Sequence, residues 1–134
     1  MKFNGKILIV DDEAHIRKFV TLILRQLGCS FFVEAGNGQD ALAVYQAEQP
    51  DLVLMDVNMP QMDGIEALRQ LRTIDPEAIV VMLTSLVNRD TIEKALEFGA
   101  VNYIRKDTPK DEIAQALSET IESCFGEAEE TINP

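Results

Sequence analysis

Acidic, hydroxyl and ammonium side chains stand at the ends of four short apolar runs in this chain of 134 residues. They are Asp11, Asp12, Asp56, Thr84 and Lys106. In a sheet of parallel strands the carboxyl ends lie along one edge, and ligands bind at that edge. If the apolar runs form such a sheet, these side chains converge on one site.

The charges of this group indicate what the site binds. Two unit charges ~4 Å apart repel by ~4 kcal/mol at an effective dielectric of ~20, and one lysine cannot offset three carboxylates. Either some carboxylates are protonated or a divalent cation lies among them, and a few carboxylates with room for water suit Mg²⁺. A phosphoryl group on the open side of the metal would complete its coordination, held by Lys106 and Thr84.

Each of these residues also has an ordinary structural interpretation. Asp11 or Asp12 could cap a helix, which is a common use of aspartate. Asp56 and Thr84 could lie in turns, and Lys106 could be a solvated surface lysine. Their convergence at strand ends favours a functional site, since function is inferred from groups that meet.

The elements that would position these residues follow from hydrophobic patterning. Short runs rich in β-branched or aromatic residues predict five strands, at Lys6–Val10, Phe31–Ala35, Leu52–Met55, Ile79–Leu83 and Val101–Ile104. Three of the runs are almost continuously apolar, as in strands buried on both faces, whereas Glu34 and Asn102 place the second and fifth nearer the edges. A helix-length segment follows each run. The pattern predicts an α/β fold, a doubly wound five-stranded parallel sheet with five helices.

Local signals predict where several helices begin and end. The first helix carries an apolar stripe that ends at Gly28; its residues are Ile16, Phe19, Val20, Ile23, Leu24 and Leu27. Asp63 with Glu66 predicts a capping box at the third helix, and Asn88 predicts a cap at the fourth. Thr108 and Pro109 suit the cap and first position of the fifth helix. Gly99 and Gly126 are expected to close the fourth and fifth, while Gly36-Asn37-Gly38 is interpreted as a plain turn.

Composition and charge exclude several classes of protein. The chain has 46% hydrophobic and 26% charged residues, as expected of one globular domain, here 1–126 followed by a short acidic tail, 127–134. With 12 Lys and Arg against 23 Asp and Glu, its formal charge of −11 argues against direct nucleic-acid or membrane-surface binding. Cys29 and Cys124 are expected to be free thiols. No apolar run is long enough for a signal peptide or membrane span, so a cytoplasmic location is expected.

Four motifs in order, ILIVDDE, LVLMDVNMPQMDG, VVMLTS and YIRK, resemble the receiver domain of two-component response regulators, the CheY-like (βα)5 flavodoxin-like fold. The resemblance runs from about Lys6 to Phe125. It implies that Asp56 is the phosphoacceptor, taking a phosphoryl group from a phosphohistidine on a sensor histidine kinase or histidine phosphotransfer protein. It further implies roles for six other residues. Asp11, Asp12 and the Asn58 carbonyl bind Mg²⁺ with Asp56, Lys106 pairs with the phosphoryl group, and Thr84 and Tyr103 form a switch.

The resemblance also implies how the signal is passed on. The protein would phosphorylate and dephosphorylate itself rather than turn over substrate, and would bind a downstream protein target. The implied surface comprises the fourth helix, fifth strand and fifth helix, including Thr91, Lys94, Ala95, Tyr103 and 109–118. The sequence leaves open the cognate kinase and target, dimerisation on phosphorylation, and whether the chain stands alone or belongs to a longer protein.

Three departures from the family pattern lie around the expected site. Asp107 stands where the family has proline, Ser85 replaces the commoner alanine, and Arg105 adds a second cation beside Lys106. In similar domains, the positions of Asn58 and Leu86 flank the path of attacking water. Because the apolar Leu86 cannot orient water, we expect the phosphorylated form not to be unusually short-lived.

Three other functions share parts of this pattern. A flavodoxin-like flavin binder needs phosphate-binding donors after the first strand, where this chain has Asp11-Asp12-Glu13. A phosphatase of the haloacid dehalogenase type needs a second aspartate where this chain has Asn58, and carries its motif after the first strand rather than the third. The main alternative is a receiver-like interaction module that is not phosphorylated.

Overall fold

A computed structural model describes residues 3–85 and 88–126, in which strands and helices alternate along the chain. The strands are β1 (Lys6–Val10), β2 (Phe31–Ala35), β3 (Leu52–Met55), β4 (Val80–Thr84) and β5 (Asn102–Arg105). The helices are α1 (Ala14–Gln26), α2 (Gly38–Glu48), α3 (Gly64–Ile74), α4 (Arg89–Glu97) and α5 (Lys110–Ile121), followed by a π-helical turn, η1 (Glu122–Gly126). Leu86 and the acidic tail, 127–134, lie outside the described residues.

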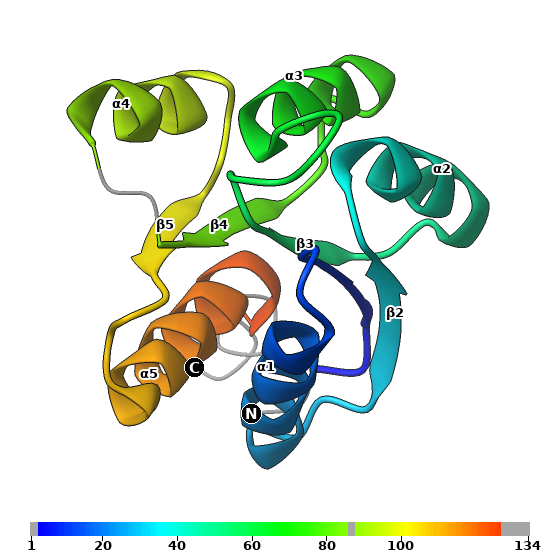
Figure 1. Cartoon of the computed structure of the whole chain (residues 1–134). Coiled ribbons are helices and arrows are strands. Elements are labelled where there is room, and N and C mark those ends of the chain that lie inside the picture. The colour runs from blue at the N-terminus through cyan, green and yellow to red at the C-terminus, as the bar shows by residue number, and fades with distance from the viewer. Residues whose placement is uncertain (1–2, 86–87, 127–134) are drawn as a thin grey trace, which may run out of the picture.

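The strands form one parallel sheet in the order β2-β1-β3-β4-β5. Helices α1 and α5 lie on one face, and α2, α3 and α4 lie on the other (Figure 1). The predicted doubly wound α/β fold is confirmed, and so are the edge positions of the second and fifth strands. Because β1 and β3 are neighbours at the centre of the sheet, the residues that follow them are brought side by side.

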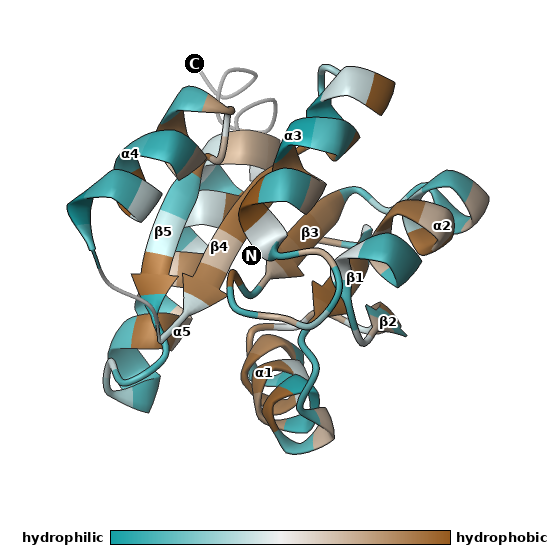
Figure 2. Cartoon of the chain, turned by 45° about the horizontal axis from the view of Figure 1, so that its top comes forward, coloured by the Kyte–Doolittle hydropathy of each residue, from teal (hydrophilic) through white to brown (hydrophobic). Residues whose placement is uncertain are grey.

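Two apolar layers, one on each face of the sheet, form the core. In Figure 2 the central strands are brown, and the helices that cover them are largely teal on their outer sides. Leu8 and Met55 belong to the layer under α2 and α3, and Ile9 and Leu54 belong to the layer under α1 and α5. The predicted stripe of α1 is wrong at one position, because Phe19 lies at the margin of the buried face and is 37% exposed.

The last two strands lie one residue later than their apolar runs predict. β4 ends at Thr84 rather than Leu83, and β5 ends at Arg105 rather than Ile104. Thr84 pairs with Arg105 in the ladder, so backbone hydrogen bonding continues past the last apolar side chain. Thr84, one of the predicted site residues, is therefore part of the sheet itself.

The helix starts agree with the sequence in two cases and differ in two. Asp63 and Asn88 accept hydrogen bonds from the N–H groups of Glu66 and Thr91, at 2.9 and 2.8 Å. The prediction that Thr108 caps α5 is wrong, because Pro109 occupies that position without a side-chain bond and its carbonyl accepts the first helical N–H groups. Gly36-Asn37-Gly38 is more than a plain turn. The Asn37 side chain caps α2 by accepting from the Asp40 N–H at 2.8 Å.

The helix ends use glycine where the backbone turns left-handed. Gly28 and Gly99 have φ of 98° and 100° and follow the ends of α1 and α4, as predicted. The fifth helix changes to a π-helical turn before it reaches Gly126. Phe125 in that turn packs against the buried Phe3, with ring centroids 4.7 Å apart. None of the described helices is long and apolar enough to cross a membrane.

Candidate functional site

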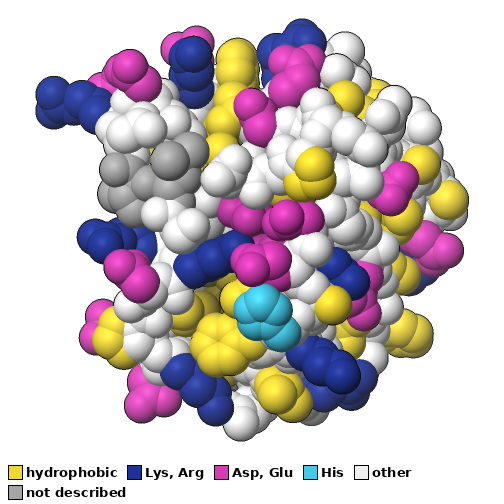
Figure 3. All heavy atoms as spheres, in the orientation of Figure 1, with side chains coloured by type: hydrophobic (Ala, Val, Ile, Leu, Met, Phe, Trp, Pro, Cys, Tyr) yellow, Lys and Arg dark blue, Asp and Glu magenta, His cyan; other side chains and the backbone are white. Residues whose placement is uncertain are grey.

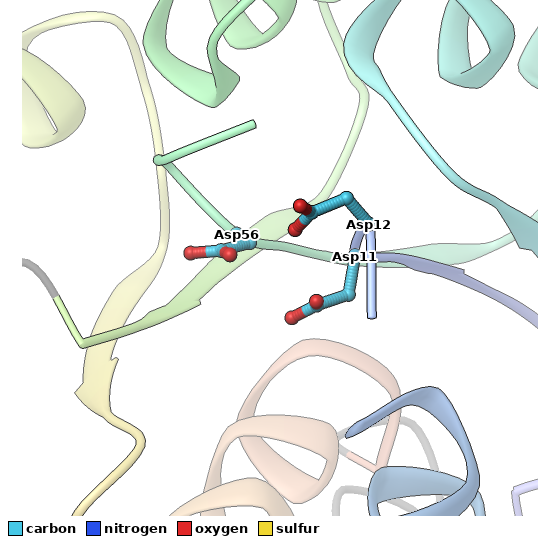
Figure 4. Close-up of side chains that lie close together, drawn as sticks. All are labelled: Asp11, Asp12 and Asp56. Atoms are coloured by element: carbon cyan, nitrogen blue, oxygen red, sulfur yellow. The ribbon is translucent and has the colours of Figure 1, made fainter. Parts of the chain in front are cut away.

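Three carboxylates lie together at the carboxyl edge of the two central strands. Val10 of β1 pairs with Met55 of β3, and Asp11 and Asp56 are the next residues on each strand. The Asp56 N–H donates to the Val10 carbonyl at 3.0 Å, which carries the ladder into the site. One carboxylate oxygen from each of Asp11, Asp12 and Asp56 lies within 4.8 Å of the others (Figure 4).

Lys106 reaches this cluster from the end of β5. Its Nζ lies 2.7 Å from Oδ2 of Asp11 and 3.0 Å from Oδ2 of Asp56. Its backbone N–H donates to the Thr84 carbonyl at 2.9 Å, so β4 positions the lysine. The side chain is 15% exposed, which excludes the alternative of a solvated surface lysine. The helix-cap alternative for Asp11 and Asp12 is also wrong, because Glu13 holds the cap position of α1.

Burial sets the electrostatics of the cluster. Burial raises the pKa of Asp11 above its ordinary value and the charge of Asp56 adds to this, although Lys106 and the Glu13 N–H partly offset both. Burial alone would lower the pKa of Lys106, but the two carboxylates that it contacts outweigh this and raise it. The lysine therefore stays protonated, and its one ammonium faces three carboxyl groups.

The donor set fits a small divalent cation. Asp11 and Asp56 are buried, whereas Asp12 is exposed. The cluster therefore has two carboxylates held by packing and one side that is open to solvent. Hard oxygen ligands with room for water are what Mg²⁺ prefers. Figure 3 shows acidic side chains gathered at the middle of this face, with basic side chains to either side. Among residues 3–85 and 88–126, no other group of three His, Cys, Asp or Glu side chains has this spacing.

Asn58 lies beside the cluster in the loop after β3. Its backbone N–H is 3.4 Å from Oδ1 of Asp56, and its side chain is exposed. Gly64, at the start of α3, approaches the same strand end even more closely. Its N–H donates to the Val57 carbonyl at 2.7 Å, and a Cβ at position 64 would overlap the Asp56 carbonyl oxygen. Only glycine allows α3 to start this close to Asp56.

Thr84 and Tyr103 lie on neighbouring strands on the Lys106 side of the cluster. Thr84 is fully buried at the end of β4. Tyr103 is half-buried against the layer that contains Met55 and Val57, while Ile104 belongs to the opposite layer, as strand alternation predicts. Burial, and after it the charge of Asp56, raises the pKa of the Tyr103 hydroxyl, which is consistent with a position near the carboxylates.

Two expectations about neighbouring residues need correction. Arg105 does not add a second cation to the site, because its guanidinium binds both carboxylate oxygens of the exposed Asp107, at 3.0 and 2.8 Å. Ala95 cannot belong to an outer binding surface, because it is fully buried against α4's neighbours. Thr91 is half-buried and Lys94 is exposed, so they are accessible parts of α4.

One residue near the site was not predicted from the sequence. Arg17 of α1 donates from Nη1 to the Asp11 carbonyl at 2.6 Å and from Nε to Oε1 of Glu34, also at 2.6 Å. Its partners are a backbone carbonyl in the loop after β1 and a side chain on β2, so no local motif marks it. The single histidine, His15, is exposed on α1.

Known proteins match the chain over nearly all of its described length. The family model of the response regulator receiver domain matches residues 7–118. The chain is 37% identical to the chemotaxis protein CheY of Bacillus subtilis over 116 residues, covering 87% of this chain and 97% of that protein. It is 40% identical to sporulation initiation phosphotransferase F of the same organism over 114 residues, covering 85% and 91%.

Solved structures agree with this match. A CheY-like receiver domain protein from Methanospirillum hungatei superposes with a TM-score of 0.83 at 26% identity, covering 93% of this chain and 99% of that one. CheY in a CheX–CheY–BeF3–Mg²⁺ complex from Borrelia burgdorferi gives a TM-score of 0.82 at 29% identity, covering 87% and 88%. The chain therefore belongs to the response regulator receiver domain family.

Proposed function

We propose that this receiver of a two-component phosphorelay accepts its phosphoryl group on Asp56, from a phosphohistidine of a sensor histidine kinase or histidine phosphotransfer protein. One observation carries the proposal. The Asp56 carboxylate is 5% exposed, bound by Lys106 at 3.0 Å, and shares its edge of the sheet with two more carboxylates. A buried excess of negative charge at a strand end destabilises the fold, and such arrangements concentrate at functional sites.

In the transfer reaction the protein forms a single covalent bond. A carboxylate oxygen of Asp56 forms a bond to phosphorus while the phosphorus–nitrogen bond of the donor breaks, and the electron pair remains on the imidazole nitrogen. Catalysis of phosphoryl transfer relies on positioning and on neutralising charge. Lys106, held protonated between Asp11 and Asp56, is placed to attract the oxygens of the incoming group.

Mg²⁺ is the proposed cofactor. Asp11, Asp12 and Asp56 would hold it, with the Asn58 carbonyl as a further ligand. The ion would neutralise repulsion between these carboxylates and the phosphoryl oxygens. The Borrelia burgdorferi relative, whose structure includes Mg²⁺ and BeF3, supports this choice.

The output is proposed to be a conformational switch without substrate turnover. Thr84 and Tyr103 would respond to the phosphoryl group, and a downstream protein would bind the α4–β5–α5 surface. Leu96 and Val101, at the end of α4 and just before β5, are 53% and 46% exposed and supply apolar area there. We place this domain at 1–126 and in the cytoplasm, where the free thiols of Cys29 and Cys124 stay reduced.

Phosphorylation of the Asp56→Asn variant tests the proposal. Wild-type protein incubated with acetyl phosphate and Mg²⁺ should gain the mass of one phosphoryl group, and Asp56→Asn should gain none. Asp63→Asn is a matched control, because Asp63 is an exposed aspartate and asparagine caps helices as well. The same comparison with a phosphohistidine donor tests the natural reaction.

The alternative of a receiver-like module that is not phosphorylated makes the opposite prediction. Wild-type protein that gains no phosphate from either donor would establish that alternative. An Asp56→Asn variant that gains as much phosphate as wild type would show that Asp56 is not the acceptor. The complete set of Asp11, Asp12, Asp56 and Lys106 argues against it.

A further inference from the structure

We infer that Arg17 is a positioning residue for the Mg²⁺ ligands that follow β1, because it holds the peptide that joins Asp11 to Asp12. The inference rests on the proposed function and adds a residue to it. Arg17 lies on α1, outside the carboxylate cluster, and acts on the loop backbone rather than on a bound group.

The guanidinium of Arg17 links three elements. Nη1 donates to the Asp11 carbonyl at 2.6 Å, and Nε donates to Oε1 of Glu34 on β2 at 2.6 Å. The Arg17 side chain is 21% exposed and the Glu34 side chain is 54% exposed. A planar guanidinium donates in two fixed directions at once, so α1, the loop after β1 and the edge strand are held in one geometry.

The contact with Arg17 supplies a partner for the last polar group of Asp11. The Asp11 N–H donates to the Ala35 carbonyl at 3.1 Å, and Oδ1 accepts from the Glu13 N–H at 2.9 Å. Oδ2 contacts Lys106, and Arg17 holds the remaining polar group, the carbonyl. All the polar groups of this residue are therefore bound within the protein.

The next residue shows why this matters. Asp12 is exposed, so packing does not determine where its carboxylate lies. Its backbone begins at the peptide whose oxygen Arg17 binds, and the plane of that peptide sets the direction of the Asp12 chain. Metal sites depend on such outer contacts, because they orient the ligands before the ion arrives.

The charge of Arg17 is largely matched by Glu34, which separates its role from that of Lys106. Lys106 contacts the carboxylates of Asp11 and Asp56 directly, whereas Arg17 contacts a carbonyl and a carboxylate on β2. Replacing Arg17 should therefore disturb ligand geometry more than net charge in the cluster.

Mg²⁺ titration of three variants of the full chain tests the inference, with calorimetry as the readout. Arg17→Met should weaken Mg²⁺ binding about 10-fold, the usual loss when an outer contact of a metal ligand is removed. Arg17→Lys keeps the charge but loses the planar guanidinium that donates in two fixed directions. Its Mg²⁺ affinity should fall between those of wild type and Arg17→Met. Lys18→Met removes an exposed positive charge from the neighbouring position, and should stay within about twofold of wild type because solvent screens it.

Two further readouts distinguish positioning from general destabilisation. In Mg²⁺-free protein, Arg17→Met should shift the Asp12 backbone ¹⁵N resonance, because a hydrogen bond to the preceding carbonyl polarises that peptide; Lys18→Met should leave it in place. At saturating Mg²⁺, acetyl phosphate should phosphorylate Arg17→Met at close to the wild-type rate, so that the defect lies in Mg²⁺ affinity alone.

The outcomes separate failure of the inference from failure of the proposed function. If wild-type protein neither binds Mg²⁺ nor takes up phosphate, the proposed function is wrong. If wild type does both and Arg17→Met binds Mg²⁺ as tightly, or Lys18→Met loses as much affinity, the inference about Arg17 is wrong. Should Arg17→Met not fold, Arg17→Lys decides: weaker binding than Lys18→Met supports positioning, and equal binding overturns it.

Discussion

The two ends of the sheet differ in how their carboxylates are paired with hydrogen-bond donors and cations. At the amino end, Lys6 donates from Nζ to Glu48 at 3.0 Å and from its backbone to Asp51 at 2.8 Å, while the Tyr45 hydroxyl donates to Asp75 at 2.6 Å. At the carboxyl end, Asp11, Asp12 and Asp56 share the single ammonium of Lys106.

The difference shows which charges stabilise the fold and which serve the reaction. The amino-end carboxylates are partly or fully exposed and each has its own donor, so little energy is lost in bringing these groups together. At the carboxyl end, Asp11 and Asp56 are buried and the three carboxylates share one ammonium, so the fold holds them at a cost. Departures of this kind from local consistency are expected at functional sites.

Adding Mg²⁺ should produce the largest change, and only at the carboxyl end. At about 100 times its Kd, an ion that binds only the folded state raises the free energy of unfolding by about 2.7 kcal/mol. Urea unfolding with Mg²⁺ or with a chelator measures this. Asp12→Asn should reduce this gain in stability, whereas Asp51→Asn, at the amino end, should keep it. An Asp12→Asn variant that gains as much stability as wild type would show that the ion binds elsewhere.

Removing the lysine should have the next largest effect. Lys106→Met leaves Asp11 and Asp56 without a cation, and without Mg²⁺ it should lower the free energy of unfolding by about 2 kcal/mol, less than the ~3–5 for a fully buried pair. Mg²⁺ should restore most of the loss. A loss that Mg²⁺ leaves unchanged would mean that Lys106 contributes packing rather than charge.

Lys6→Met is the matched control at the other end of the sheet. The Lys6–Glu48 pair is 33% and 45% exposed, so breaking it should cost at most about 0.5 kcal/mol. That small loss should not depend on Mg²⁺. Urea unfolding of both lysine variants, with and without Mg²⁺, gives the comparison directly.

The smallest of the three main effects concerns Tyr45. The Tyr45 hydroxyl, and after it the Glu77 N–H, lowers the pKa of Asp75 below its ordinary value. Tyr45→Phe removes the stronger of these bonds and should cost about 1 kcal/mol at neutral pH, allowing for the exposure of Asp75. Phosphorylation and Mg²⁺ binding should be unchanged, because the pair lies far from the carboxyl end.

The pH dependence of this effect has a definite sign. Because the folded-state pKa of Asp75 is lowered, its contribution is present above the unfolded pKa of about 4 and is lost as the pH falls through the folded value. The stability difference between wild type and Tyr45→Phe should therefore be largest near neutral pH and narrow in acid. A difference that widens in acid would contradict the assigned hydrogen bond.

Most of the fold and the main carboxylates could be predicted from the sequence. Continuous apolar runs predicted the observed bounds of β1 and β3, because both strands are buried on both faces, and the β-branched and aromatic run of β2 predicted its bounds at the sheet edge. Hydrophobicity could not predict that β4 and β5 extend to Thr84 and Arg105, because polar residues continue the ladder through backbone bonds.

The contacts missed at the site are those that depend on tertiary structure. Pairing of Arg105 with Asp107 required knowing that the side chains turn toward each other outside the cluster. Arg17 binds a carbonyl, and every residue has one, so its sequence position carries no signal. The close approach of Gly64 to Asp56 was likewise not predicted, because the sequence around Gly64 indicates only a helix cap.

The strand order also has a consequence for the time course of folding. Asp56 and Lys106 are separated by 50 residues, and they meet only after β5 has joined β4 at the edge of the sheet. Contacts this distant in the chain form late, because loop closure must precede them. A growing chain that has paired β1 with β3 holds the carboxylates without their lysine, and the reactive geometry arises with the last strand. Under the proposed function, only molecules that complete the sheet can relay a signal.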